Sequence, residues 1–281
     1  MTLSYRSLWC WVLVFLLLPG VALADMKPLR IGIVPSLSPR VLLKNYEYVR
    51  RYLARELQQT LELGTATDFR TFHKQVIAGE YDVVVTPAHF ARLAQRETGW
   101  LPLATYKNAH RALLLVAASS SIESVEDLRG TSIASPDPLA LVSIQSRQWL
   151  SEKGLRPNRD YRLIDMPSFT NAVHAVLKQQ AAVAVISPSS YQQLSEHLKN
   201  ATRIFQTLPE VPAPIWIVNP KSRIDHARLK ASLLQFTQEV PEGREFFQQN
   251  GYGGLRAVSP AQMQALDVYA DEVKSLLDAP P

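Results

Sequence analysis

Cysteine is almost absent from this 281-residue chain, since its only cysteine, Cys10, lies in an uncharged apolar stretch near the N-terminus. If that stretch is removed, the remaining chain can form no disulfide, thiolate metal site or cysteine nucleophile. Its fold must then be held by packing alone. With 47% apolar residues, the chain is long enough to bury the core of one large domain or of two modest lobes.

The short motifs that mark common enzyme classes are also absent. The sequence has no His-Glu-x-x-His, no Gly-x-Ser-x-Gly and no Gly-x-x-x-x-Gly-Lys-Ser/Thr, and Gly32 stands alone where a dinucleotide fingerprint would need several glycines. A triad scattered along the sequence stays open, because triads are recognised in space. We expect a protein that is not an enzyme and that needs no cofactor or metal.

Long runs of charge of one sign are lacking as well. The formal net charge is +5, and it falls to +4 without the first 24 residues, which contain only one charged side chain, Arg6. This small excess is spread along the chain and does not indicate a nucleic-acid partner or a membrane surface. It is compatible with a mild attraction for small anions or with ordinary solubility.

The first 24 residues have the pattern of a secretory leader. Arg6 precedes an uncharged stretch over 7–24, and Ala22-Leu23-Ala24 is a small-x-small cleavage pattern. The alternative is a retained membrane anchor, since 18 residues lie just inside the spanning range. Pro19-Gly20 and the cleavage pattern favour removal. We therefore expect 1–24 to be a cleaved signal peptide and the mature protein to be periplasmic.

Four junctions share one design, in which an apolar run ends in a capping residue and a proline and a helical pattern follows. They are Ser38-Pro39, Thr86-Pro87, Asp137-Pro138 and Ser187-Pro188. Ser, Thr and Asp are favoured helix N-caps, and proline suits the first helical position. Each junction therefore predicts a helix N-terminus at the carboxyl end of a strand. The junctions form two pairs about one hundred residues apart, which predicts two similar halves.

Helical patterns alternate with continuous apolar runs in both halves, which is typical of buried parallel strands covered by helices. We predict an α/β fold of two lobes, each a mostly parallel sheet flanked by helices. Two further apolar segments, 111–118 and 215–218, predict crossing strands between the lobes. Lobe 1 then consists of 25–109 and 214–281, lobe 2 consists of 110–213, and the lobes can hinge.

Several stretches add a more specific indication. They are Ser38-Pro39 with Tyr46 and Tyr52-Leu53, Gly79-Glu80-Tyr81-Asp82 ahead of a strand, the segment 122–130, Asp137-Pro138, and Thr170-Asn171-Ala172. Over about 29–220 the chain resembles the phosphate/phosphite/phosphonate family of periplasmic substrate-binding proteins of ABC transporters. The resemblance implies the type II two-lobed binding-protein fold, a small-molecule ligand and an ABC permease as partner. We expect a monomer.

The resemblance fails at the ligand cradle. In phosphonate binders the Asp-Pro is followed, one residue later, by Ser-Thr-Ser, whose hydroxyl and N–H groups hold the phosphonyl oxygens. Here Ala140, Leu141 and Val142 occupy these places, and Phe169 replaces an expected acidic residue. An aminoalkyl phosphonate is therefore a poor candidate ligand. Phe169 with Leu139 or Leu141 would suit a more apolar pocket.

Helix N-termini that face a cleft still attract a carboxylate or oxyanion. The predicted ligand-binding residues are the polar side chains near those helix ends, namely Ser36, Ser38, Tyr46, Thr86, His89, Ser168, Thr170, Asn171 and Ser187. The alternative roles are structural: Ser38, Thr86 and Ser187 as caps of their own helices, and Tyr46 as a core residue. A metal site from His89, His110 and a third partner is a further alternative.

We expect a periplasmic solute-binding protein of an ABC-type uptake system. Its ligand would be a small anion, phosphonate-like or another oxyanion or carboxylate, bound between the lobes by hinge closure. The alternative is a periplasmic ligand-sensing protein that feeds a sensor receptor in the inner membrane and not a transporter.

Overall fold

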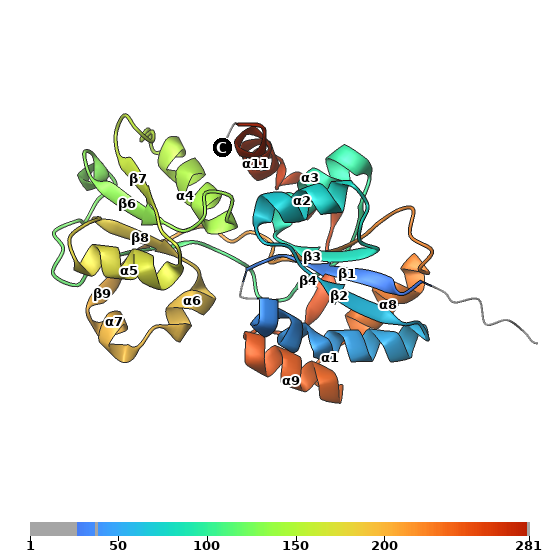
Figure 1. Ribbon diagram of the computed structural model, residues 1–281. Helices are drawn as coiled ribbons and strands as arrows, with labels where there is room; N and C mark the ends of the chain where they lie inside the picture. The colour runs from blue at the N-terminus through green and yellow to red at the C-terminus, as the bar shows by residue number, and fades with distance from the viewer. Residues whose placement is uncertain (1–26, 37–38, 280–281) are drawn as a thin grey trace, which may run out of the picture.

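The computed structural model describes residues 27–36 and 39–279. The predicted signal peptide and Ser38 lie outside these residues. The described strands form two separate sheets, each with helices packed on it, so the predicted two-lobed α/β architecture is confirmed (Figure 1).

The sheet of lobe 1 has six strands in the described chain, in the order β11-β4-β10-β3-β1-β2. The strands are β1 (Leu29–Ile33), β2 (Leu61–Gly64), β3 (Val83–Thr86), β4 (Leu101–Tyr106), β10 (Ile215–Val218) and β11 (Leu255–Ala257). β1 pairs in parallel with β2 and β3, whereas β10 runs antiparallel between β3 and β4. The helices of this lobe are α1 (Pro39–Leu57), α2 (Phe69–Ile77), α3 (Ala88–Thr98), α8 (His226–Gln235), α9 (Pro241–Asn250), α10 (Pro260–Gln264) and α11 (Asp267–Asp278).

The sheet of lobe 2 has five described strands in the order β7-β6-β8-β5-β9. They are β5 (Leu113–Ala117), β6 (Ser132–Ser135), β7 (Arg162–Asp165), β8 (Val183–Ile186) and β9 (Thr202–Thr207). β6 is parallel to β7 and β8, and β5 runs antiparallel between β8 and β9. The helices are the 3₁₀ turn η1 (Glu126–Leu128), α4 (Leu141–Glu152), α5 (Phe169–Leu177), α6 (Pro188–Gln193) and α7 (Glu196–Asn200).

Each sheet has helices on both faces, as the apolar character of its strands requires. In lobe 1, one core lies between the sheet and α1, α8 and α9, and the other lies between the sheet and α2 and α3 (Figure 1). In lobe 2, α4 covers one face and α5 and α7 cover the other. The two crossings lead directly into β5 and β10, which are inner strands of their sheets.

The four predicted helix starts have different outcomes. Ser187 is the N-cap of α6 and accepts a hydrogen bond from the Ser190 N–H, as predicted. Thr86 is not a cap, because Pro87 has extended ψ (146°) and α3 begins one residue later. Asp137 is not a cap either: its Oδ1 accepts from the Leu139 N–H in a turn, and α4 begins only at Leu141.

Two glycines in lobe 1 are required by a close approach of an aromatic ring. Tyr81 is 2% exposed and lies against both Gly32 and Gly64, where an added Cβ would come within 2.8 Å and 2.9 Å of ring atoms. The Tyr81 hydroxyl donates to Gln75 Oε1 at 2.8 Å, and the Arg30 guanidinium lies 5.1 Å from the ring centroid. The ring is thus fixed from several sides, and it cannot move aside without losing these contacts.

We expect Gly32→Ala to lower the free energy of unfolding by about 1–3 kcal/mol, because the new methyl group overpacks the Tyr81 ring. Urea unfolding of the variant measures this loss. In a double-mutant cycle with Tyr81→Ala, the combined loss should be smaller than the sum of the single losses, since removal of the ring removes the clash. Strict additivity would contradict the proposed packing.

Candidate functional site

The register of the strands brings their carboxyl ends to the two crossings. Thr86 at the end of β3 pairs with Ile215, where β10 begins, and Ile186 at the end of β8 pairs with Leu113, where β5 begins. β1 and β6 run parallel beside β3 and β8, so they end at the same edges. In α/β sheets, ligands bind outside the carboxyl ends of the strands. Both lobes therefore present the carboxyl ends of their strands to the same junction.

The crossing segments are held together at this junction. His110 and Val211, one in each crossing, exchange backbone hydrogen bonds of 2.9 Å and 2.8 Å. Gln145, a buried residue of α4, accepts from the Ala112 N–H at 2.7 Å and donates to the Pro209 carbonyl. The side chain of Gln145 thus ties both crossings to lobe 2, a role that the sequence analysis missed.

On the lobe 1 side, the described residues at the junction include Thr86 and Ser36. Thr86 ends β3 and is 2% exposed. Ser36 follows β1, is exposed, and donates its N–H to the Val34 carbonyl at 2.8 Å. Thr86 and Ser36 lie at the carboxyl ends of neighbouring strands, β3 and β1.

On the lobe 2 side, a cluster of hydroxyl groups follows β8. The Ser187 Oγ lies 3.0 Å from Ser189 Oγ and 2.8 Å from Ser190 Oγ, and it accepts from the Ser190 N–H. Ser187 is 4% exposed, Ser190 is half-buried and Ser189 is exposed. The predicted capping role of Ser187 therefore coexists with a polar surface at the start of α6.

The second group of predicted residues in lobe 2 lies farther from the crossings. Ser168 is the N-cap of α5, accepting from the Asn171 N–H and donating to Asn171 Oδ1 at 2.8 Å. Thr170 and Asn171 are exposed. They follow β7, an edge strand that β6 separates from β8. The structure thus brings Ser168, Thr170 and Asn171 together, but apart from Ser187.

Tyr46 lies in the core of lobe 1. It is 8% exposed, its hydroxyl lies 3.2 Å from the Tyr106 hydroxyl, and its ring meets Phe246 edge-on at 5.2 Å. Tyr252 stacks on Tyr106 with ring centroids 3.9 Å apart. Burial raises the pKa values of Tyr46 and Tyr106 well above the usual range for tyrosine and raises the pKa of Tyr252 to about 12. All three hydroxyls are therefore neutral at physiological pH. Tyr46 packs in the core of lobe 1 beside Tyr106, the last residue of β4.

The residues at the start of α4, where the sequence departs from the phosphonate cradle, take part in apolar packing. Ala140 precedes the helix and provides no side-chain cap. Leu141 is 5% exposed and belongs to a core cluster of lobe 1, while Leu139 packs with Phe90 of α3. Phe169 packs within lobe 2 instead. The expected apolar pocket of Phe169 with Leu139 or Leu141 is therefore wrong, because the leucines contact the opposite lobe.

Two histidines lie at this junction, His89 and the half-buried His110. His89, in the first turn of α3, is fully buried, and its Nε2 lies 2.9 Å from the Leu139 carbonyl oxygen, to which it donates. His89 Nδ1 and His110 Nε2 have no hydrogen-bond partner within the described chain. Burial lowers the pKa of His89 to about 3 and that of His110 to about 4. Both imidazoles are neutral at physiological pH, and His89 joins the two lobes.

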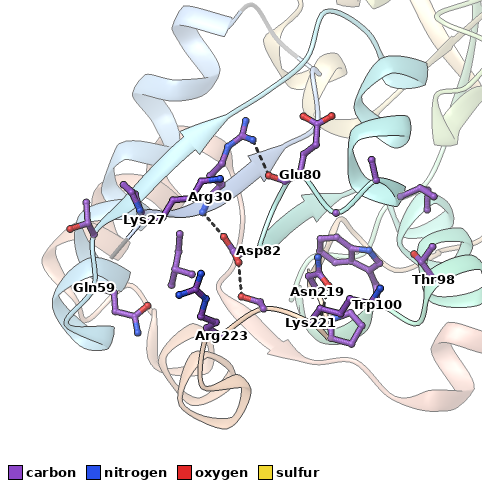
Figure 2. Close-up of a pocket in the computed structure, with 18 of the residues that line it drawn as sticks. Lys27, Arg30, Gln59, Glu80, Asp82, Thr98, Trp100, Asn219, Lys221 and Arg223 are labelled. Atoms are coloured by element: carbon purple, nitrogen blue, oxygen red, sulfur yellow. Dashed lines mark hydrogen bonds between the residues drawn. The ribbon is translucent and has the colours of Figure 1, made fainter. Parts of the chain in front are cut away.

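A cavity of about 760 Å³ lies at the opposite edge of lobe 1, at the start of β1 and β3 (Figure 2). Asp82, drawn there with Arg30, accepts from the Arg30 N–H at 2.9 Å and from the Ser222 hydroxyl at 2.7 Å. The Asp82 carboxylate thus fastens the 219–223 segment to β1. The motif Gly79-Glu80-Tyr81-Asp82 has a structural role here, far from the strand ends at the crossings.

Within 27–36 and 39–279, no three His, Cys, Asp or Glu side chains are grouped so that they could hold a metal ion. Over the same residues, no helix is both long and apolar enough to span a bilayer.

Replacement of Gln145 by leucine should lower the free energy of unfolding by about 2–4 kcal/mol, because the Ala112 N–H and the Pro209 carbonyl each lose a buried partner. Urea unfolding of the mature chain provides the measurement. Gln235→Leu, at an exposed position of α8, is the control for a change of glutamine to leucine that leaves the crossings untouched. Equal stability of Gln145→Leu and the parent would show that the crossings are not tied to α4.

The buried His89 predicts acid sensitivity. An unfolded histidine titrates near pH 6.5, so between about pH 6.5 and 3 the unfolded chain binds protons that His89 does not bind when folded. The stability from His89 is thus complete above pH 6.5 and falls by up to about 1.4 kcal/mol per pH unit on acidification. His89→Gln keeps an N–H donor for Leu139 but cannot titrate, so its unfolding free energy should fall less steeply.

The control for this measurement is His197→Gln, because His197 is exposed on α7 and its replacement should leave the slope unchanged. Urea unfolding at a series of pH values compares the three proteins. Parallel curves for the parent and His89→Gln would contradict a buried neutral His89.

The comparisons with known proteins agree with this geometry. A family model described as the periplasmic phosphonate substrate-binding protein of ABC transporters matches residues 31–263. Among solved structures, XAC2383 from Xanthomonas citri bound to chloride is 19% identical with a TM-score of 0.77, over 88% of this chain and 99% of that chain. The search of curated proteins gives no match.

Two similar structures carry phosphonate names. PhnD1 from Prochlorococcus marinus, in complex with methylphosphonate, is 12% identical with a TM-score of 0.75, covering 90% of this chain and 98% of that chain. PA3383 from Pseudomonas aeruginosa, a binding protein component of an ABC phosphonate transporter, is 14% identical with a TM-score of 0.72, covering 90% and 89%. At these identities the structures show the fold, while the family model covers most of the sequence. This chain therefore belongs to the phosphonate family of periplasmic substrate-binding proteins of ABC transporters.

Proposed function

We propose that this protein binds a small anion between its lobes and delivers it to an ABC permease in the inner membrane. The observation that carries the proposal is the pairing of Thr86 with Ile215 and of Ile186 with Leu113, which puts the strand ends of both lobes at one junction. Helix N-termini that follow such strands favour anions through their N–H groups and dipoles. Membership of the family supports a role as the binding component of a transporter.

The lobes, 25–109 with 214–281 and 110–213, would move about the crossings. The two crossings are the described chain segments between β4 and β5 and between β9 and β10. A ligand that touches both lobes favours the closed arrangement by its differential affinity for the two states.

The ligand would be held by polar groups of both lobes, and not by the start of α4. Lobe 1 offers Ser36 and Thr86, supported by Tyr46 and His89, and Ser38 follows Ser36 closely in the sequence. Lobe 2 offers Ser187, Ser168, Thr170 and Asn171. Because Leu141 is buried against lobe 1, these serine, threonine and asparagine groups are the available partners for an oxyanion. Methylphosphonate, present in the similar PhnD1 structure, is the first compound to test.

We further propose that residues 1–24 are removed on export and that the mature periplasmic protein is a monomer. The leader pattern over 7–24 supports export. Size-exclusion chromatography of residues 25–281 tests the monomeric state directly.

A thermal-shift screen tests the ligand class. Residues 25–281 are heated with methylphosphonate, phosphate, phosphite, alkanesulfonates, carboxylates and amino acids. A specific ligand at one hundred times its Kd adds about 2.7 kcal/mol of stability and should raise Tm by several degrees in a concentration-dependent way. A response to neutral compounds only would overturn the preference for an anion.

The double variant Thr170→Ala/Asn171→Ala tests the lobe 2 contacts, because both side chains are exposed and their loss should leave the fold intact. Its affinity for the stabilising compound should fall at least tenfold, since about 1.4 kcal/mol is a small loss for two hydrogen bonds to an anion. Gln192→Ala, also exposed, is the control. Unchanged affinity in the double variant would remove Thr170 and Asn171 from the site.

A further inference from the structure

The start of α4 packs against lobe 1 although α4 itself belongs to lobe 2. We call the contact made by Leu139 and Leu141 the apolar seat. Leu139 and Leu141 are 8% and 5% exposed. Leu139 packs in one cluster with Phe90 and Leu93 of α3, and Leu141 packs in a lobe 1 cluster with Ile215 of β10. Two leucines of one lobe are therefore covered by the other lobe.

Polar contacts accompany this apolar seat. His89 of α3 donates from Nε2 to the Leu139 carbonyl oxygen at 2.9 Å. Arg147 of α4 pairs with Glu272 of α11, with Arg147 Nε and Glu272 Oε1 separated by 2.6 Å and both side chains less than one-fifth exposed. Gln148 donates to the other carboxylate oxygen of Glu272. Each of these bonds joins lobe 2 to lobe 1.

The C-terminal helix α11 completes the contact. Its residues Ala270 and Val273 are fully buried in the same cluster as Phe90 of α3 and Ile144 of α4. Figure 1 shows α11 between the two lobes, beside α4. The tail of the chain thus packs on lobe 1, as expected from the sequence, and also on lobe 2, which the sequence analysis did not predict.

The other helices of lobe 2 make no comparable contact. Among the described residues, no hydrogen bond or salt bridge joins α5, α6 or α7 to lobe 1. The apolar residues of these helices pack within lobe 2. The junction is therefore closed along α4 and held only by the crossings elsewhere.

We propose that the contact of α4 with α3 and α11 stays formed in the ligand-free protein and acts as a fixed edge of the hinge. Leu139 and Leu141 determine this, because apolar burial favours the contact without any ligand. Opening and closing then occur on the α6 side alone. The ligand does not touch the start of α4. The location of the ligand rests on the proposed function, whereas the fixed edge is a property of the ligand-free chain.

Distances between spin labels test the fixed edge, and the mature chain suits them because its sequence after residue 24 contains no cysteine. One pair, Ser151→Cys on α4 with Ser275→Cys on α11, spans the proposed seat. A second pair, Lys44→Cys on α1 with Gln192→Cys on α6, spans the other side. All four positions are exposed.

In the ligand-free protein, double electron–electron resonance should give a single narrow distance for the Ser151/Ser275 pair. Methylphosphonate, or another anion that raises Tm, should leave this distance unchanged and shift only the Lys44/Gln192 distance. A second, longer population of the Ser151/Ser275 pair without ligand would overturn the proposal. The ligand-free result holds or fails even if no compound of the anion panel binds, so it is distinguishable from failure of the proposed function.

The variant Leu139→Asp/Leu141→Asp should add a longer population to the Ser151/Ser275 pair, because the charged side chains cannot stay in the apolar seat. Val268→Asp, at a 48% exposed position of α11, is the matched control and should not change the distance. If the double variant does not fold, Leu139→Ala, which removes part of the seat, should broaden the same distribution. An unchanged distance in the folded double variant, or in Leu139→Ala where the double variant does not fold, would overturn the role of the leucines.

Discussion

The position of β5 and β10 is the constraint on which the rest of the structure depends. Each strand arrives directly from a crossing and is hydrogen-bonded on both sides within its new sheet. The carboxyl ends of the neighbouring strands β3 and β8 are therefore fixed beside the crossings. Residues that follow these strands, such as Thr86 and Ser187, lie at the junction of the lobes because of this pairing and not because of their own chemistry.

The junction has two unlike sides. Along α4, leucines and a paired arginine and glutamate join the lobes directly, and His89 adds a buried hydrogen bond. At α6, the chain presents the hydroxyls of Ser187, Ser189 and Ser190 and makes no polar contact with lobe 1 among the described residues.

The fold was predictable because it depends on local patterns that repeat along the chain. Apolar runs, helical spacing and the capping serine at 187 are visible within a few residues of one another. The site was only partly predictable, because its contacts join distant residues. The sequence shows Gln145 as a glutamine on an apolar face of a helix, but it does not show which groups its side chain binds. Leu139 and Leu141 have their partners in the other lobe, and Glu272, in the C-terminal tail, has its partners on α4. The failure of Thr86 as a cap follows from the ψ of Pro87.

Hydrogen–deuterium exchange of residues 25–281 tests the central claim most directly, namely that the ligand binds at the carboxyl ends of the strands beside the crossings. The mature chain is compared with and without a saturating concentration of the anion that raises Tm most. The account predicts slower exchange at Ser36 and at the start of α6, beside the carboxyl ends of β1 and β8, and no change in the 219–223 segment that lines the cavity at the opposite edge. Protection of 219–223, with Ser36 and the start of α6 unchanged, would contradict it.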